Sequence, residues 1–255
     1  MASGAAAVAV DADCVVGFEL RYLEMGRAGA IERRDTLKVC WNTRFEDLPP
    51  VRRFPSYQGQ RNFPGLYFAA CMNRHVGFES WLERDNLMML DFSPMVRSFA
   101  AQPFWLSWSS GGKTRRHVPD FFVRMVDGRG VVVDVRADER IKPADAEAFA
   151  ATADACESVG WGYRRVGELD PVQAANVRWL AGYRHARCLR EEYRVQLVEA
   201  FARSAPLMTT VEAVGDRIAV LPSLFHLMWT GVLTTDLTTA PLTGASLVSV
   251  RGDRR

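Results

Sequence analysis

The order of apolar and polar positions predicts an α/β domain in the middle of the chain. Some segments repeat apolar residues at helical spacing, and others are short apolar runs bounded by turn residues. The turn signal Asp127–Gly130 joins two such runs into a hairpin. The predicted elements are a helix at 76–90, strands at 96–102 and 104–108, a polar loop at 109–116, strands at 118–123 and 131–136, a helix at 142–158, a strand at 161–166 and a helix at 171–181. This order predicts an α/β fold with a mixed sheet flanked by helices.

A mainly helical pattern follows residue 185. The predicted elements are helices at 186–204, 209–214 and 222–231, then strands at 232–237 and 247–250. Three helices followed by a hairpin predict a small winged-helix-like domain at the C-terminal end.

The pattern divides the chain into an N-terminal arm at 1–55, an α/β domain at 56–170 and a C-terminal domain at 171–255. The arm is expected to be partly mobile, because its signals are weak and Pro49-Pro50 breaks any helix. Arg52, Arg53 and Arg61 surround an irregular, aromatic-containing stretch that either lies on nucleic acid or packs across the next domain.

Composition restricts the class of protein only loosely. The chain has 32 Lys and Arg against 30 Asp and Glu, so any nucleic-acid surface must be local. No apolar run approaches the ~20 residues of a membrane span, so no membrane part is expected. The five cysteines are scattered without a C-x-x-C pair, which favours a reducing cytoplasm.

The hairpin from Val118 to Arg136 carries charges in an apolar place. Asp120 lies in its first strand, and Asp134 and Arg136 lie in its second. Asp134 and Arg136 share a face because side chains alternate along a strand. Asp120 joins that face if the connecting loop has an odd number of residues, which glycine-containing loops of three or five residues satisfy.

Two carboxylates beside a cation favour a metal site that acts on phosphate. Asp120 and Asp134 supply the hard oxygen ligands that Mg²⁺ prefers, and Mn²⁺ is possible in its place. A helical carboxylate, Glu83 or alternatively Glu79, completes the shell. The alternative is that Asp120 and Asp134 form a buried salt-bridge cluster with Arg136 that has only a structural role. His117, next to this hairpin, either supports a metal ligand of the site or is an ordinary strand residue, and the second interpretation is favoured.

Two groups of cations are candidate DNA contacts. Lys113, Arg115 and Arg116 lie in the predicted polar loop, and a solvated loop is the alternative. Arg187, Arg190 and Arg194 fall close to one face of a predicted helix, where a solvated face is the alternative.

Several ordered segments resemble those of a known family. Glu83, V-P-D at 118–120 and D-V-R at 134–136 resemble the core of the restriction-like nuclease superfamily, in which an acidic pair precedes a lysine. The wider context between Ser56 and Val250 resembles the TnsA-type endonuclease subunit of heteromeric transposases. Its segments are F-E-S-W-L-E-R-D at 78–85, V-R-S-F-A-A-Q-P-F-W-L at 96–106, H-V-P-D-F-F-V at 117–123, V-V-V-D-V-R at 131–136, A-C-E-S-V-G-W-G-Y-R-R-V at 155–166 and L-F-H-L-M-W-T-G at 224–231.

The resemblance implies a division of labour in transposition. The subunit would cut the 5′ ends of the transposon, a DDE-type transposase would handle the 3′ ends, and an ATP-dependent regulator would contact the pair. It implies catalytic roles for Glu83, Asp120 and Asp134, with Arg136 in the position of the family lysine. Arginine keeps its charge and so cannot transfer a proton. The alternatives are a catalytically silent DNA-binding or bridging subunit on the same fold, and a generic restriction or repair nuclease.

Overall fold

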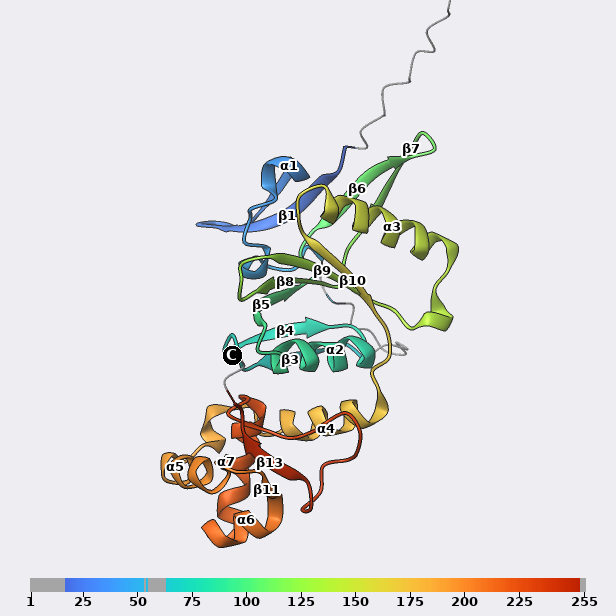
Figure 1. Ribbon diagram of the computed structural model, residues 1–255. Helices are drawn as coiled ribbons and strands as arrows, with labels where there is room; N and C mark the ends of the chain where they lie inside the picture. The colour runs from blue at the N-terminus through green and yellow to red at the C-terminus, as the bar shows by residue number, and fades with distance from the viewer. Residues whose placement is uncertain (1–16, 53, 55–62, 253–255) are drawn as a thin grey trace, which may run out of the picture.

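A mixed four-stranded sheet forms the centre of the molecule. The computed structural model describes residues 17–52, 54 and 63–252 (Figure 1). The strand order is β10-β9-β8-β5, with β9 and β10 parallel and the other pairs antiparallel. The strands are β5 (Val96–Ala101), β8 (Phe121–Met125), β9 (Gly130–Val135) and β10 (Gly162–Val166). The predicted α/β class with a mixed sheet is confirmed.

Helices cover both faces of this sheet because its strands are apolar on both sides. Phe121, Val123 and Val133 belong to the core that contains α2 (Trp81–Phe92) and α4 (Pro171–Ala181). Phe122 and Val132 alternate with them and belong to the core that contains α3 (Pro143–Glu157). Strands buried on both faces read as continuous apolar runs, which is why the sequence revealed them.

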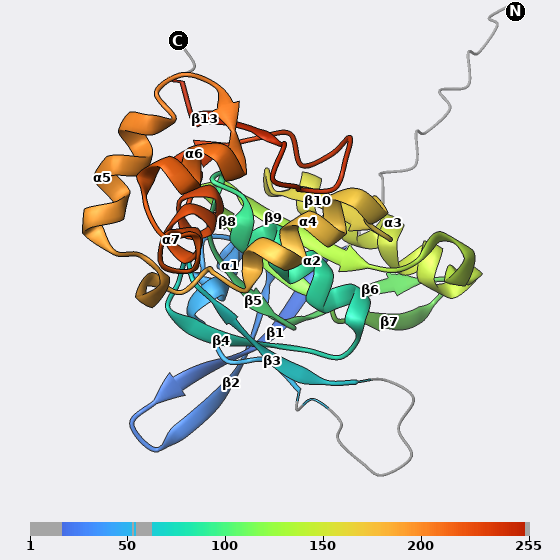
Figure 2. The same cartoon turned by 90° about the horizontal axis from the view of Figure 1, so that it is seen from below.

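A second sheet contains the N-terminal segment. The expectation that residues 1–55 form an arm is therefore wrong for the described residues 17–52. Strands β1 (Glu19–Gly26) and β2 (Gly29–Thr36) form a hairpin, and β1 pairs with β6 (Trp105–Ser110). The sheet order is β2-β1-β6-β7. Figure 2 shows the hairpin projecting from the body. A short helix α1 (Leu37–Cys40) and a 3-10 turn, Phe45–Asp47, follow it. The residues 1–16, Arg53 and 55–62, which include Arg61, lie outside the described residues.

Two sequence-predicted elements in the central region change. The polar loop at 109–116 contains the end of β6 and most of strand β7 (Lys113–His117), which pairs with β6 although it lacks an apolar face. The helix predicted from residue 76 begins at Trp81, because the preceding apolar residues form β4 (Arg74–Phe78) against β3 (Gly65–Ala69). Ser80 caps the helix by accepting a hydrogen bond from the Glu83 backbone N–H.

The C-terminal part consists of helices and a small antiparallel sheet. The described elements after α4 are α5 (Glu191–Ala200), β11 (Ala205–Pro206), α6 (Leu207–Val214), α7 (Arg217–Trp229), β12 (Leu233–Thr234) and β13 (Leu247–Val250). The strand order is β11-β13-β12. Helix α4 packs on both α2 and α7, so one apolar core continues from the central part into the C-terminal part.

Two C-terminal helix predictions were wrong in their limits. The helix predicted at 186–204 is a 3-10 turn, Ala186–Cys188, followed by α5. The chain turns between them because the Ser223 hydroxyl accepts from the Arg190 N–H and donates to the Cys188 carbonyl. Helix α7 begins before Pro222, because the Asp216 carboxylate caps it. Within the described ranges, no helix is long and apolar enough to cross a membrane.

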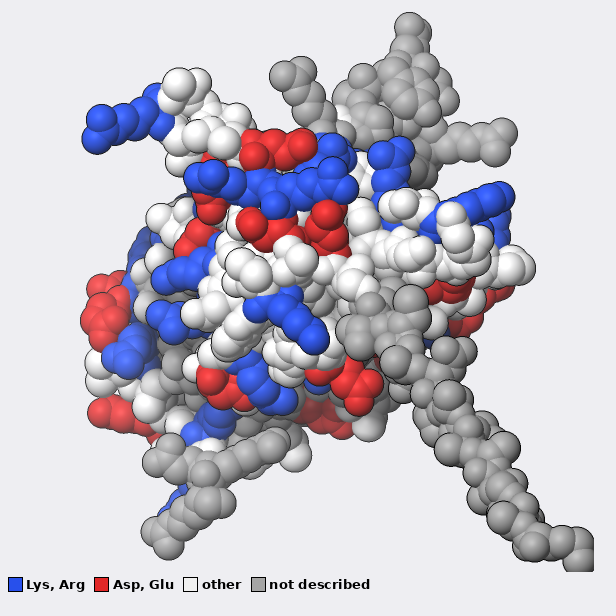
Figure 3. Space-filling view, turned by 90° about the horizontal axis from the view of Figure 1, so that it is seen from above, with Lys and Arg blue, Asp and Glu red and all other residues white. Residues whose placement is uncertain are grey.

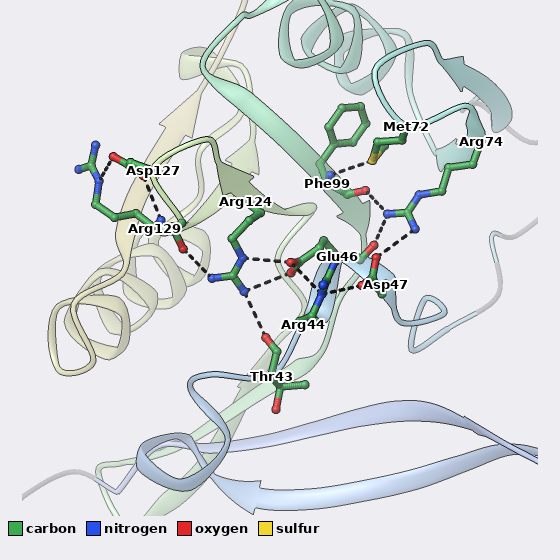
Figure 4. A network of polar contacts seen from close by, with 11 residues as sticks. Thr43, Arg44, Glu46, Asp47, Met72, Arg74, Phe99, Arg124, Asp127 and Arg129 are labelled. Carbon is green, nitrogen blue, oxygen red and sulfur yellow. Dashed lines mark hydrogen bonds and ion pairs between the residues drawn. The ribbon is translucent and has the colours of Figure 1, made fainter.

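A buried ion pair joins the N-terminal segment to the central sheet. Glu46 is 2% exposed, and Arg124 of β8 donates to its two carboxylate oxygens at 3.1 Å each. Arg124 also donates to the Thr43 carbonyl, and Arg74 of β4 donates to the carbonyls of Glu46 and Phe99 (Figure 4). The network therefore ties the turn after α1 to three strands.

Replacement of Glu46 by glutamine should destabilise the fold strongly. The change leaves the Arg124 guanidinium, whose side chain is 14% exposed, without its counter-charge, which costs up to about 3–5 kcal/mol. Urea denaturation of Glu46→Gln and wild type measures the loss. The matched control is Glu24→Gln, whose exposed pair with Arg33 is worth less than about 1 kcal/mol. Equal losses for the two variants would contradict this account.

Candidate active site

A cavity of about 590 Å³ opens where the start of β8 and the end of β9 meet the start of α2. Glu83, Asp120 and Asp134 all line it, and so does Arg136. In all, six carboxylates and four arginines line the cavity, so its formal charge is negative. The structure therefore brings together all four residues that the sequence proposed for catalysis.

The register of the β8–β9 hairpin places the two aspartates on one face. Phe121 pairs with Val133, so Asp120, one residue earlier, falls opposite Asp134. Five residues, 125–129, lie between the paired Arg124 and Gly130. This odd number confirms the prediction that Asp120 points to the same side as Asp134. Asp120 is held there by the Val135 N–H, which donates to its Oδ2 at 2.7 Å.

The Asp134 carboxylate is buried and held by two donors from elsewhere in the chain. It is 1% exposed. Its Oδ1 lies 2.8 Å from Nε2 of His117 on β7, and its Oδ2 accepts from the Tyr163 hydroxyl of β10 at 2.9 Å. Burial and the Asp134 charge raise the pKa of Tyr163, so the phenol stays protonated and donates.

The sequence analysis named one partner of Asp134 and missed the other. The favoured interpretation of His117 as an ordinary strand residue is wrong, and the alternative that it supports a ligand agrees with the contact between its ring and Asp134. Tyr163 carried no signal, because β10 pairs with β9 in parallel only after the long connection through α3.

Glu83 and Glu79 differ in the hydrogen bonds that their carboxylates accept. Both oxygens of Glu83 accept hydrogen bonds within the helix cap, from the Glu79 N–H at 2.8 Å and from the Ser80 hydroxyl at 2.9 Å. Glu79 precedes α2, and its Oε2 accepts from Arg52 at 2.9 Å. Its Oε1 is buried without a hydrogen-bond partner among the described residues. Burial raises the pKa of Glu83, and the Glu79 charge adds to the rise.

Repulsion among carboxylates is concentrated on Asp120. Burial, followed by the charges of Glu83 and Asp134, raises the pKa of Asp120 well above its usual range. The Val135 N–H and the Arg136 charge act in the opposite direction but do not reverse the shift. Asp120 therefore lies where an added positive charge would be most stabilising.

Arg136 lines the cavity without an ion pair to either aspartate among the described residues. Its guanidinium is 46% exposed at the side chain and pairs with Asp145 of α3 at 3.3 Å. The alternative of a buried salt-bridge cluster between Arg136 and the two aspartates is therefore wrong.

The candidate DNA contacts separate into different places. Arg116 lines the cavity, whereas Arg115 faces Trp108 and lies 3.6 Å from Glu147 of α3. Lys113 lies exposed at the end of the β6–β7 hairpin. Arg187, Arg190 and Arg194 belong to the turn before α5 and to its start, at the other end of the molecule from β6–β7 (Figures 1 and 2). DNA contact by these three stays a prediction.

The carboxylates of the cavity are chemically suited to bind a divalent cation, but they are not grouped as closely as the ligands of a bound metal. Within the described residues, no three His, Cys, Asp or Glu side chains are grouped closely enough to hold a metal. Asp120 and Asp134 still offer the hard oxygen atoms that Mg²⁺ prefers. From the described residues, no hydrogen bond reaches the second oxygen of Asp120. The mutual repulsion at Asp120 is the feature that a cation would relieve.

A mixed sheet with carboxylates gathered at the ends of two strands is consistent with a nuclease fold. Residues 93–168 match the family model described as TnsA-like endonuclease N terminal. Over this segment the chain is similar to a TnsA-like endonuclease domain, which confirms the resemblance stated from the sequence for these residues. The match contains Asp120, Asp134 and Arg136, whereas Glu83 lies before it. No curated protein matches the chain.

Asp120→Asn should stabilise the metal-free protein at pH 8. A carboxyl whose pKa is raised by folding favours the fold below its unfolded pKa near 4, and this contribution is lost as pH rises through the folded pKa. Asparagine removes the repulsion and can still accept from Val135. We expect the melting temperature in EDTA to rise by a few degrees at pH 8, with the difference vanishing towards pH 4. A variant that melts lower than wild type at pH 8 would contradict the repulsion.

Proposed function

We propose that this protein is the endonuclease subunit of a heteromeric transposase and hydrolyses phosphodiester bonds at the transposon 5′ ends. The observation that supports this most is the presence of Glu83, Asp120 and Asp134 in one cavity, two of them inside the TnsA-like segment. Acidic side chains on a negative cavity wall repel a phosphodiester unless a cation comes between them. That charge supports a metal-dependent reaction.

Asp120, Asp134 and Glu83 are the residues that would hold Mg²⁺ or Mn²⁺, with Glu79 as the alternative to Glu83. Such an ion, when bound, would supply a Lewis acid and a water of lowered pKa. His117 and Tyr163 fix the Asp134 carboxylate by occupying one side of each of its oxygens. Arg136 stabilises the negative charge that develops on the phosphate, for which it must turn from Asp145.

The partners proposed are transposon-end DNA, a DDE-type transposase that handles the 3′ ends and an ATP-dependent regulator. They rest on the family resemblance. The C-terminal order of α5, β11, α6, α7, β12 and β13 supports a winged-helix-like domain, since it places three helices around a small antiparallel sheet. Helix α7 is largely buried there and Arg217 is its one arginine, without any lysine, so it is poorly suited to contact DNA.

A catalytically silent, DNA-binding or bridging subunit is the second candidate. Two observations favour it. Arg136 stands in the position of the family lysine and is paired with Asp145. Both oxygens of Glu83 are engaged in the helix cap.

Asp120→Ala and Asp134→Ala should abolish DNA cleavage. Each removes a proposed ligand of the cation, and several kcal/mol of transition-state stabilisation correspond to roughly a thousandfold in rate. Nicking of labelled transposon-end DNA, with the partner transposase and Mg²⁺ or Mn²⁺, measures the effect.

The matched control is Asp127→Asn, an aspartate in the exposed turn of the same hairpin. Glu83→Gln and Glu79→Gln in the same assay identify the third carboxylate by the larger loss. A wild-type protein that never nicks DNA, with transposition unchanged in Asp120→Ala, would reject the enzyme and leave the silent subunit.

Arg136→Lys should retain cleavage, whereas Arg136→Met should lose it by roughly a hundredfold or more, because the charge is what the transition state uses. Single-turnover nicking rates measure both. A rate in Arg136→Met equal to that of wild type would show that the cation at this position takes no part.

A further inference from the structure

Trp105 lies between two arginines at the edge of the cavity. The Arg116 guanidinium carbon is 4.9 Å from the centre of its ring, and that of Arg21 is 5.3 Å away. The three residues come from neighbouring strands of the second sheet, with Trp105 on β6, Arg21 on β1 and Arg116 on β7. Trp105 and Arg116 also line the cavity that holds the carboxylates.

The strand register puts these three side chains on one face of the sheet. Arg21 pairs directly with Trp105, and Arg116 pairs with Ser107, two residues further along β6. The opposite face of the sheet carries Leu106 and Trp108, which are buried in the core. The face with Trp105 is therefore the one turned away from that core.

The two guanidinium groups keep hydrogen-bonding capacity for a ligand. A guanidinium that stacks on a ring uses its flat face, so its in-plane N–H donors remain available. Arg116 has no ion pair among the described residues, and the exposed pair of Arg21 with Glu32, at 3.3 Å, is weak. Arg115 and Lys113 alternate with Arg116 and so point to the opposite face.

We propose that Arg21 and Arg116, ordered by the Trp105 ring between them, form a clamp for the phosphate backbone of DNA beside the cavity. The clamp rests on the proposed function, which makes DNA the substrate. Trp105 is a positioning residue. Because the guanidinium groups lie over its ring, it does not stack a base, and the clamp binds without regard to sequence.

Charge supports a phosphate ligand at this place. The cavity itself is negative, so a DNA strand needs cations beside it to approach. Figure 3 views the end of the molecule with β1–β2 and β6–β7 and shows Lys and Arg interspersed with Asp and Glu. Two of the cations there are neutralised by neighbours, since Arg33 pairs with Glu24 and Arg34 with Glu19.

The test is equilibrium binding of the full-length chain to a fluorescent 30-base-pair duplex in EDTA, at a series of salt concentrations. Arg116→Ala and Arg21→Ala should each weaken binding roughly fivefold to tenfold near 0.1 M salt and lower the slope of log K against log salt by about 0.9. Trp105→Leu should weaken binding although it removes no charge. The arginine changes should then have smaller effects in the Trp105→Leu background, because the three act together.

The matched control is Arg129→Ala, an exposed arginine paired with Asp127 in the β8–β9 turn, which should leave the slope unchanged. Melting temperatures of all variants verify folding. An unchanged slope in Arg116→Ala, an equal loss in Arg129→Ala, or no duplex binding by wild type overturns the clamp.

The EDTA assay separates this proposal from the nuclease itself. Binding that depends on Arg116 in a protein that never nicks DNA supports the clamp and rejects the enzyme. Normal nicking together with unaffected binding in all three variants supports the enzyme and rejects the clamp.

Discussion

The register of the β8–β9 hairpin is the constraint on which the site depends. Because Phe121 faces Val133, Asp120 and Asp134 meet on one side of the sheet. A loop longer or shorter by one residue would turn one of them to the other face. The same alternation sends Phe122 and Val132 into one core and Phe121 and Val133 into the other. The position of the carboxylates is thus inseparable from the packing of the sheet.

Holding these carboxylates together is unfavourable, and the surrounding structure compensates for it. The Val135 N–H fixes Asp120, while His117 and Tyr163 fix Asp134. Glu83 serves as the reciprocal partner in the cap of α2, so one side chain both starts the helix and enters the cavity. The repulsion that remains on Asp120 is what a bound cation would relieve, which links the stability of the fold to its proposed chemistry.

Much of the central sheet was predictable because buried strands are continuous apolar runs. Helix α4 was predicted at 171–181 and begins and ends at those residues. The N-terminal segment was misjudged, although the stretch 19–22 does alternate polar and apolar residues and carried a short strand signal. That error hid β1 and with it Arg21. Strand β7 was missed because it has no apolar face, and its pairing with β6 holds it in place.

The sequence by itself placed Asp120, Asp134 and Arg136 in or directly beside two apolar strands. It also predicted that they share a face, because side-chain alternation is a local property of the chain. Only the tertiary structure decided what those charges touch. His117 and Tyr163 reach Asp134, and Asp145 takes Arg136, through contacts between segments that pattern alone does not bring together. Such contacts depend on the order of strands in the sheets and on how helices cover them, which local spacing does not encode.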